Sequence, residues 1–467
     1  MIKYTCENNS HNIKLMQDAA VKEKIKLNNK NLNVENESIN TNNETMREIM
    51  EQQLTQVKYI DLCSGIGGFR VALESINNIK SKCVLSADIK QDAIDTYNLN
   101  FNENNKIIDI YTLKNVDIEP FDLLCAGFPC QPFSLAGHKK GFSDKRGGMI
   151  FKIIDICKYH KPRFVVLENV YNLMTLENGN CIKEIKKLFE DIGYIVNFKK
   201  LNSRDFGCAQ SRERVYIVCT IDNIFDFEDI KYKEKVCLNS VIDYTNNKTS
   251  IDPIFSEKIL KIHKESPVFG CKIGDKRGGE NNIHSWDLGF NGILNNDEKT
   301  LINEIMLNRR KKHWAINKKI VWMDGMPLTY DEIKTFHDHK NLKEMLDNLV
   351  IMKYLRLEKP KDLINGKREY KEDSLEGYNI CKGKLSFPIS KILDPNDISP
   401  TLTATDSHKL AVIINDNIIR NLSSSEMKKI CEFPDTFKIP KHVNYGDLFG
   451  NMATPPVIRA ILDILLG

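Results

Sequence analysis

The sequence lacks several features that mark common protein classes. It contains no run of eighteen apolar residues, which excludes a transmembrane helix, and its first thirty residues lack the apolar core of a secretory signal. The thirteen cysteines include no C-x-x-C pair, and their odd number argues against a disulfide framework and a zinc site. We therefore expect a cytoplasmic protein without a membrane contact and without a metal.

A strong positive charge is also missing. The net charge is only +4 over 467 residues, so any surface for nucleic acid has to come from local clustering of basic side chains. Hydrophobic residues make up 41% and charged residues 28%, which is typical of a soluble globular protein. The length is sufficient for two or three domains.

The pattern of apolar residues changes along the chain. Residues 1–56 are polar and rich in asparagine, which predicts a poorly ordered extension. From residue 57 on, strands are predicted at 57–63, 83–89, 121–127, 164–170 and 214–221, and helices at 68–76, 91–101, 149–160 and 181–192. This alternation indicates a mainly parallel sheet covered on both faces, with ligands at the carboxyl ends of the strands. Between about 222 and 398 the rhythm is lost, which predicts a separate, less regular domain.

A glycine-rich loop, DLCSGIGGF, joins the first predicted strand to the first helix. Its glycines at 65, 67 and 68 allow a tight turn and a close approach of a ligand to the backbone. Arg70 stands where a dinucleotide fingerprint requires glycine, which disfavours a nicotinamide cofactor. Asp88 is placed to accept hydrogen bonds from ribose hydroxyls, and Asp109 to hold an adenine amino group. A nucleoside without a pyrophosphate, such as S-adenosylmethionine, fits this pattern, although an ordinary strand–helix turn fits the loop alone.

Three further motifs bring reactive side chains to predicted strand ends. GFPCQPFS places Cys130 between prolines after a strand, and ENV ends the next strand with Glu168. QSRER brings Arg212 and Arg214 to the start of another strand. An isolated cysteine is most often a core residue, and arginines at a strand start are often solvated. We expect these groups at one edge of the sheet, where they fit a single reaction.

That reaction is methylation of cytosine. A thiolate that adds to carbon 6 makes carbon 5 nucleophilic, and carbon 5 then attacks a sulfonium methyl group. A protonated carboxyl at N3 and a cation near O2 stabilise the charge that develops during the addition. Because the target carbon is inaccessible within a duplex, the base must be flipped out.

Together, the motifs resemble those of the cytosine-5 DNA methyltransferases of the bacterial restriction–modification type. They occur in that family's order, DLCSGIGGF, GFPCQPFS, ENV, QSRER, SPTLTA and FGNMATPP, over roughly residues 57–221 and 399–467. The resemblance implies an α/β fold, with a Rossmann-like S-adenosylmethionine-dependent methyltransferase domain and a smaller, irregular target-recognition domain. The implied catalytic and cofactor-binding domain is 57–221, and the recognition domain is 222–440. A closing helix in 441–467 returns to the first domain.

The resemblance also implies roles for single residues. Cys130 is the implied nucleophile, Glu168 contacts N3 and the amino group, and Arg214 contacts O2. Arg212 and Ser134 match positions that support the loop or the target strand. The implied cofactor-binding residues are Cys63, Gly65, Ile66, Gly67, Gly68, Asp88, Ile89, Asp109, Ile110, Gly127 and Asn451. The family usually has phenylalanine in place of Cys63, often an aromatic residue in place of Ile89, and in many members glutamate in place of Asp88.

Recognition of the DNA sequence is implied for the long segment 222–398. The predicted DNA-contacting residues of the whole chain are Gln131, Ser134, Lys276, Arg277, Arg309 and Arg310. The pair in GDKRGG is a candidate for a guanine edge, and the pair in RRKK is a candidate for phosphate. A run such as RRKK is equally typical of a solvated helix face.

Two other functions stay open. Methylation of RNA, as in the tRNA-modifying relatives, is disfavoured by the long recognition segment. A catalytically silent DNA-binding relative is expected to have lost Cys130, Glu168 or Arg214, and all three are present. We expect a monomer that acts on double-stranded DNA. No nuclease motif occurs in the chain, so a cognate restriction endonuclease would be a separate protein.

Overall fold

Six strands form the central sheet of the protein. The structure is a computed structural model that describes residues 55–128, 148–275, 279, 281–321, 325–364, 366–381 and 387–467. The strand order is β2-β1-β3-β4-β6-β5. The strands are β1 Thr55–Leu62, β2 Ile79–Ala87, β3 Leu123–Gly127, β4 Phe164–Val170, β5 Ile195–Asn202 and β6 Glu213–Thr220. The predicted Rossmann-like α/β fold is confirmed, and β1 begins two residues before the predicted start of the first strand at residue 57.

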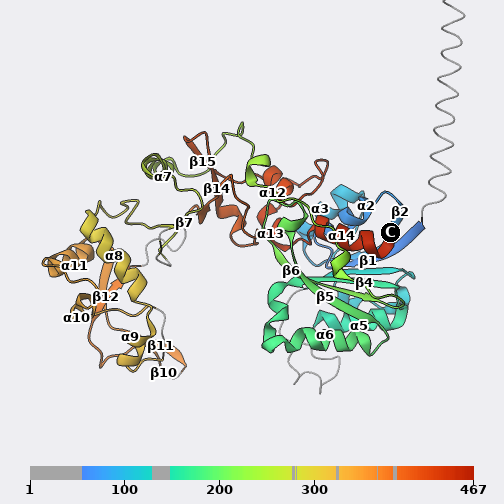
Figure 1. Cartoon of the computed structure of the whole chain (residues 1–467), viewed down its shortest axis with the longest axis horizontal. Helices are drawn as coiled ribbons and strands as arrows, with labels where there is room; N and C mark the ends of the chain where they lie inside the picture. Colours follow the sequence, from blue (N-terminus) through green and yellow to red (C-terminus); the bar gives the residue numbers. More distant parts are fainter. Residues whose placement is uncertain are drawn as a thin grey trace, which may run out of the picture.

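Helices cover both faces of this sheet (Figure 1). They are α2 Gly68–Glu74, α3 Gln91–Phe101, α5 Met149–His160, α6 Asn180–Glu190 and α14 Pro455–Leu466. A further helix, α13 Tyr445–Asn451, packs in a separate cluster that includes Ala93 of α3. Successive residues of a strand point to opposite faces. In β1, Ile60 and Leu62 therefore pack in the cluster that contains α5 and α6, whereas Val57 and Tyr59 pack in the cluster that contains α2 and α14. The sheet is buried on both sides, as its apolar strands predict.

One strand runs against the others. Strands β1 to β4 pair in parallel, but β6 is antiparallel to both β4 and β5. The start of β6 therefore lies at the same edge of the sheet as the end of β4. Strand β5 was absent from the sequence prediction because its polar stretch, which includes Lys199 and Lys200, hides the apolar alternation of an edge strand.

A second, five-stranded sheet has the order β15-β14-β13-β7-β8. It combines β7 Lys272–Ile273 and β8 Asn282–Ile283 with β13 Lys391–Ile392, β14 Leu410–Ile414 and β15 Ile418–Asn421, and α7 Pro253–Glu265 packs on β15. In Figure 1 this sheet lies between the six-stranded sheet and a third part of the molecule.

We call that third part the helical lobe. It contains α8 Asn296–Asn308, α9 Lys312–Asn317, α10 Tyr330–Lys334, α11 Leu342–Ile351, β9 Leu355–Glu358, β10 Lys361–Ile364, β11 Lys367–Tyr370 and β12 Gly377–Ile380. Its buried side chains form a core of their own. These helices were not predicted, and capping boxes at Asn295 and Thr329 are local signals that would have located two of them.

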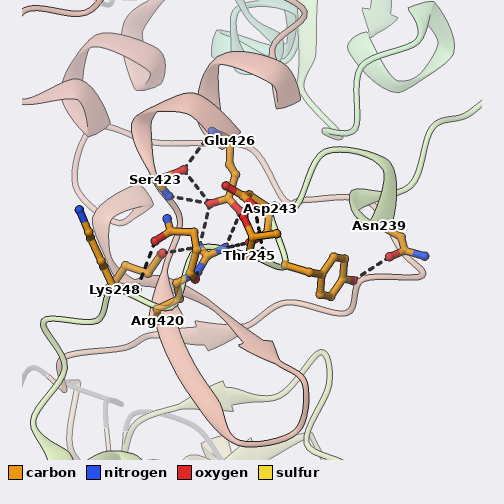
Figure 2. A network of polar contacts seen from close by, with 10 residues as sticks. Asn239, Asp243, Thr245, Lys248, Arg420, Ser423 and Glu426 are labelled. Carbon is orange, nitrogen blue, oxygen red and sulfur yellow. Dashed lines mark hydrogen bonds and ion pairs between the residues drawn. The ribbon is translucent and has the colours of Figure 1, made fainter.

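A buried polar network joins the five-stranded sheet to helix α12, Ser424–Ile430 (Figure 2). Arg420 donates to both carboxylate oxygens of Glu426, at 2.7 and 2.8 Å. The Glu426 carboxylate also accepts from the backbone N–H groups of Asp243 and Ser423. Ser423 and Glu426 form the capping box of α12, so the same glutamate caps the helix and pairs with the buried arginine.

The last helical stretch is predominantly apolar. By length and composition alone, Tyr445–Leu466 could cross a membrane, but half of it is buried within the protein. Helix α14 packs on α2. We therefore interpret this stretch as core packing, in agreement with the predicted closing helix.

Candidate active site

A cavity of about 470 Å³ opens at the carboxyl ends of the parallel strands. Apart from Gly67 and Gly68, all predicted cofactor residues line it: Cys63, Gly65, Ile66, Asp88, Ile89, Asp109, Ile110, Gly127 and Asn451. The described residues predicted to act in catalysis line it as well: Glu168, Arg212 and Arg214. Residues of five motifs that are distant in the sequence therefore share one cavity.

The glycines of the first loop serve two different purposes. Gly65 has a φ of 54°, and nothing lies within 4 Å of the position that a Cβ would occupy, so its backbone is open to a ligand. A Cβ on Gly67 would lie 2.4 Å from the Phe101 ring, and one on Gly68 would lie 2.1 Å from the carbonyl oxygen of Ala453. Gly67 and Gly68 thus permit close packing of the loop on α3 and on the chain before α14.

Asp88 connects two of the loops around the cavity. Its carboxylate accepts from the N–H of Gly65 at 2.8 Å and from the N–H of Lys90 at 2.8 Å. The side chain is half-buried, and a carboxylate has further lone pairs for ribose hydroxyls. Asp88 therefore fits the role predicted for it while also holding the glycine loop in place.

Asp109 lies on the adjacent segment, where the N–H of Ile108 donates to the backbone oxygen of Asp88 at 3.0 Å. One carboxylate oxygen accepts from the N–H of Tyr111 at 3.0 Å and caps a short 3₁₀ helix, Ile110–Thr112. Tyr111 itself lines the cavity, although the sequence analysis did not select it. Burial and the nearby Asp109 carboxylate raise the pKa of the Tyr111 hydroxyl, so this hydroxyl stays a hydrogen-bond donor at neutral pH.

Helix α13 covers the cavity from the far end of the chain. Asn451 donates to the backbone oxygen of Asp447 at 2.9 Å, and Lys90 forms an ion pair with Asp447 at 2.9 Å. Lys90 and Asp447 are thus additional cavity residues. Lys90 and Asp447 are 357 positions apart in the sequence, so the local sequence around either residue does not predict that they pair.

Cys63 stands at the position that the resemblance assigns to an aromatic residue. Its φ of 55° is in the left-handed region, and its sulfur lies 2.9 Å from the sulfur of Met149. Burial and the carboxylates of Asp88 and Asp61 raise the pKa of the thiol, so it stays protonated. Cys63 is therefore a packing residue of the cavity wall and not a thiolate.

Glu168 and Arg214 meet at the inner end of the cavity. The Arg214 Nε lies 2.9 Å from the Glu168 Oε1, and each side chain is about nine-tenths buried. Arg214 pairs in register with Val170, two residues after Glu168, so both side chains emerge on one face of the sheet. The antiparallel direction of β6 is what brings this arginine to the carboxyl end of β4.

Asn169 fixes the segment that leads to the cysteine motif. Its side-chain amide donates to the carbonyl oxygen of Phe128 at 2.9 Å, and both groups are buried. The asparagine of ENV was not predicted to have a role. The asparagine holds the last described residue before the PCQ sequence.

Arg212 has a different environment from Arg214. It is 3% exposed and donates to the carbonyl oxygens of Leu402, Gly450 and Met452 at 3.2, 3.1 and 2.8 Å. Burial and the nearby Arg214 lower its pKa to about 10, so it stays charged at neutral pH. Arg212 thus joins the QSRER, SPTLTA and FGN motifs, and this geometry indicates a positioning residue.

The predicted nucleophile and most predicted DNA contacts lie outside the described residues. These are Cys130, Gln131, Ser134, Lys276 and Arg277. Of the two remaining residues, Arg310 is exposed, whereas Arg309 is buried and donates to Asn379 within the helical lobe. The RRKK run is therefore not solvated along its whole length. Its first arginine is buried because it caps the C-terminus of α8, which packs in the core of the lobe.

Known proteins resemble this chain over most of its length. A family model described as C-5 cytosine-specific DNA methylase matches residues 57–466. The Type II methyltransferase M.NlaIV of Neisseria lactamica is 40% identical over 425 residues, which cover 88% of this chain and 99% of that protein. M.NgoBV of Neisseria gonorrhoeae is 39% identical over the same coverage. M.BanI of Aneurinibacillus aneurinilyticus is 33% identical and covers 88% of this chain and 96% of that protein. The chain therefore belongs to the family of C-5 cytosine-specific DNA methylases.

Proposed function

We propose that the protein is a DNA (cytosine-5-)-methyltransferase that uses S-adenosylmethionine and acts on a specific sequence in double-stranded DNA. The observation that carries this proposal is the shared cavity, which holds a nucleoside-type site at one end and the Glu168–Arg214 pair at the other. A methyl donor and a cytosine that enter from opposite ends would meet inside it.

The described residues fit the cofactor. The open backbone at Gly65 and the carboxylates of Asp88 and Asp109 suit an adenosine group, and Asn451 with α13 covers it. S-adenosylmethionine supplies an electrophilic methyl group on a sulfonium. Lys90 and Asp447 hold α13 against the loop after β2 and so keep water from this end of the cavity.

The other end of the cavity suits a flipped cytosine. We assign the nucleophile to Cys130: its thiolate adds to carbon 6, and the electron pair of the 5,6 double bond moves toward N3 and O2. Glu168 holds a proton at N3, and Arg214 donates to O2, so the charge that develops is stabilised. Carbon 5 then takes the methyl group. A base removes the carbon 5 proton, and the carbon–sulfur bond breaks to release the thiolate.

The experiment is expression in a host that lacks cytosine methylation, followed by bisulfite sequencing of the host genome. We expect 5-methylcytosine at one recurring motif and none from a Cys130→Ala variant that still binds DNA. Methylation by that variant would contradict the nucleophile. If the wild-type protein is soluble and leaves the genome unmethylated, the DNA substrate is wrong, and tRNA is the next substrate to assay.

We further propose that the enzyme belongs to a restriction–modification pair. Its relatives are named Type II methyltransferases, and a nuclease of the same system would recognise the same motif. DNA from the methylating host should then resist a nuclease that cuts this motif, whereas DNA from the Cys130→Ala host should be cut. Equal cutting of both DNAs would contradict this assignment.

A further inference from the structure

The segment 438–451, which includes α13, lies beside helix α3, and we call it the strap. Four polar contacts join the strap to α3 and to the N-cap residue of that helix. Their order is antiparallel, because positions rise along the strap as they fall along α3. The contacts are Lys438 with Asn100 at 2.6 and 2.7 Å, His442 with Asp95 at 3.1 Å, Asn444 with Asp92 at 3.3 Å and Asp447 with Lys90 at 2.9 Å. The strap is therefore held along its length up to the active-site cavity.

Helix α13 forms the end of the strap that reaches the cavity. Four of its residues line the cavity, Asp447 and Asn451 among them. The Lys90 Nζ lies 3.2 and 2.9 Å from the two carboxylate oxygens of Asp447. The backbone N–H of Lys90 donates to Asp88, so the main chain of this lysine is fixed independently of its side chain. The Lys90 and Asp447 side chains are 48% and 29% exposed, which places the ion pair at the mouth of the cavity.

Asp447 also fixes the orientation of Asn451. The Asn451 Nδ2 donates to the backbone oxygen of Asp447 at 2.9 Å and to its Oδ1 at 2.8 Å. Both partners are acceptors, so the nitrogen of the amide faces them, and the amide oxygen is the group that Asn451 offers to a donor of a ligand. The same Oδ1 lies 3.2 Å from the Lys90 Nζ. One carboxylate thus connects Lys90 to Asn451.

We propose that Lys90 and Asp447 are positioning residues that fix Asn451 for the cofactor. An exposed ion pair contributes little to the stability of a fold. A side chain that is already held in its binding orientation, however, loses less conformational freedom when the ligand binds, and this raises the affinity. The contacts of the strap with α3 hold the main chain, and the ion pair holds the side chains at its end. The proposal rests on the proposed function for its choice of an S-adenosyl cofactor.

The test is calorimetric titration of the full chain with S-adenosylhomocysteine in the absence of DNA. Lys90→Met should bind this ligand about two- to fivefold more weakly, as for the loss of one exposed ion pair. The loss should shrink when the salt concentration rises from about 0.1 M to about 1 M, because salt screens the pair. The matched control is Lys82→Met, which removes an exposed lysine that pairs with Glu119 and does not line the cavity. It should bind as wild type.

Two combinations of variants test whether Lys90 acts through its partners. Asp447→Asn removes the charge and keeps an oxygen that can accept from Asn451. The double variant of Lys90→Met and Asp447→Asn should bind as weakly as either single variant, because both remove the same pair. In an Asn451→Ala background, Lys90→Met should have no further effect, because the side chain that it positions is absent.

The proposal is overturned if Lys90→Met binds as wild type, if its loss persists at high salt, or if the losses from Lys90→Met and Asn451→Ala multiply. An equal loss in Lys82→Met would also overturn it. If wild type binds no S-adenosylhomocysteine, the cofactor of the proposed function is wrong, and this proposal is wrong with it. A protein that shows the expected pattern of binding but methylates no DNA would contradict only the proposed function.

Discussion

Two of the arginine–glutamate pairs in the described part of the chain are buried on both sides, and their surroundings differ. Arg214 approaches Glu168 at 2.9 Å, and Arg420 approaches Glu426 at 2.7 Å. The Glu426 carboxylate accepts from both Arg420 nitrogens, two backbone N–H groups and the Ser423 hydroxyl. Among the described residues, only Arg214 approaches the Glu168 carboxylate within ion-pair or hydrogen-bond distance.

The difference shows which pair is free to do chemistry. A carboxylate with all its lone pairs occupied is fixed and stabilises the fold, because any movement breaks several hydrogen bonds at once. A carboxylate with lone pairs to spare, at the wall of a cavity, can bind a substrate atom and exchange a proton. The number of donors around the glutamate, more than its distance to arginine, separates a structural pair from a candidate catalytic pair.

The largest effect is expected from Glu168→Gln. The amide cannot hold and release a proton at N3, so methyl transfer per folded molecule should slow by about 10²–10⁴-fold while the fold is preserved. Single-turnover transfer to duplex DNA, with thermal unfolding of the same preparation, measures both. Transfer at the wild-type rate would show that the spare lone pairs of Glu168 have no chemical role.

Glu426→Gln should have the opposite outcome. It leaves the Arg420 charge buried with a neutral partner, which costs about 3–5 kcal/mol of stability, while transfer per folded molecule is retained. Urea unfolding measures the loss. The control is Glu228→Gln, which removes an exposed ion pair with Lys199 and should cost less than about 1 kcal/mol. Equal losses in the two variants would refute the structural role.

Acid should weaken the Glu426 pair in wild type. Burial alone would raise the pKa of Glu426, but the hydrogen bonds from Arg420, Ser423 and Asp243 outweigh burial, and the pKa lies below its usual value. The stability from this group is therefore present above the usual carboxyl value and is lost as the pH falls through the lowered value. The urea midpoints of wild type and Glu426→Gln should converge as the pH falls from 7 to 3. A difference that stays constant over this range would show that protonation of Glu426 does not weaken the pair.

Asp61 is a third buried carboxyl, and its substitution should have the smallest effect of the three in mild acid. Neither oxygen has a hydrogen-bond partner among the described residues, and burial and the Asp88 carboxylate raise its pKa. The folded state then holds a proton that the unfolded state releases. Stability should therefore fall by up to about 1.4 kcal/mol per pH unit between the usual and the raised value.

The isosteric Asp61→Asn should remove this decline. We expect nearly equal stability of the two proteins in mild acid and a flatter profile for the variant toward pH 8, measured by urea unfolding. Parallel profiles would indicate that Asp61 is ionised in the folded state.

Much of the fold was predictable because its signals are local. The predicted ranges 91–101, 149–160 and 164–170 agree with α3, α5 and β4 to the residue. Most of the predicted cavity residues could be identified because their motifs lie at strand ends, whereas Asn451 lies on α13. Tyr111 and Asp447 were not predicted to line the cavity. Tyr111 is held there by a hydrogen bond from its backbone N–H to Asp109, and Asp447 is held by an ion pair with Lys90. Neither contact is part of a sequence motif.

The sequence by itself determined the alternation of strands and helices, the glycine loop and the order of the motifs, since these depend on apolar periodicity and turn chemistry within a few residues. Only the tertiary structure decided the direction of β6 and the different environments of Arg212 and Arg214. It also decided the inward turn of Arg309. Each of these depends on contacts between segments far apart in the chain, and such contacts leave no local sequence pattern. Arg212 and Arg214 are two residues apart and have the same side chain. Only the fold buries Arg212 against three carbonyl oxygens and places Arg214 beside Glu168.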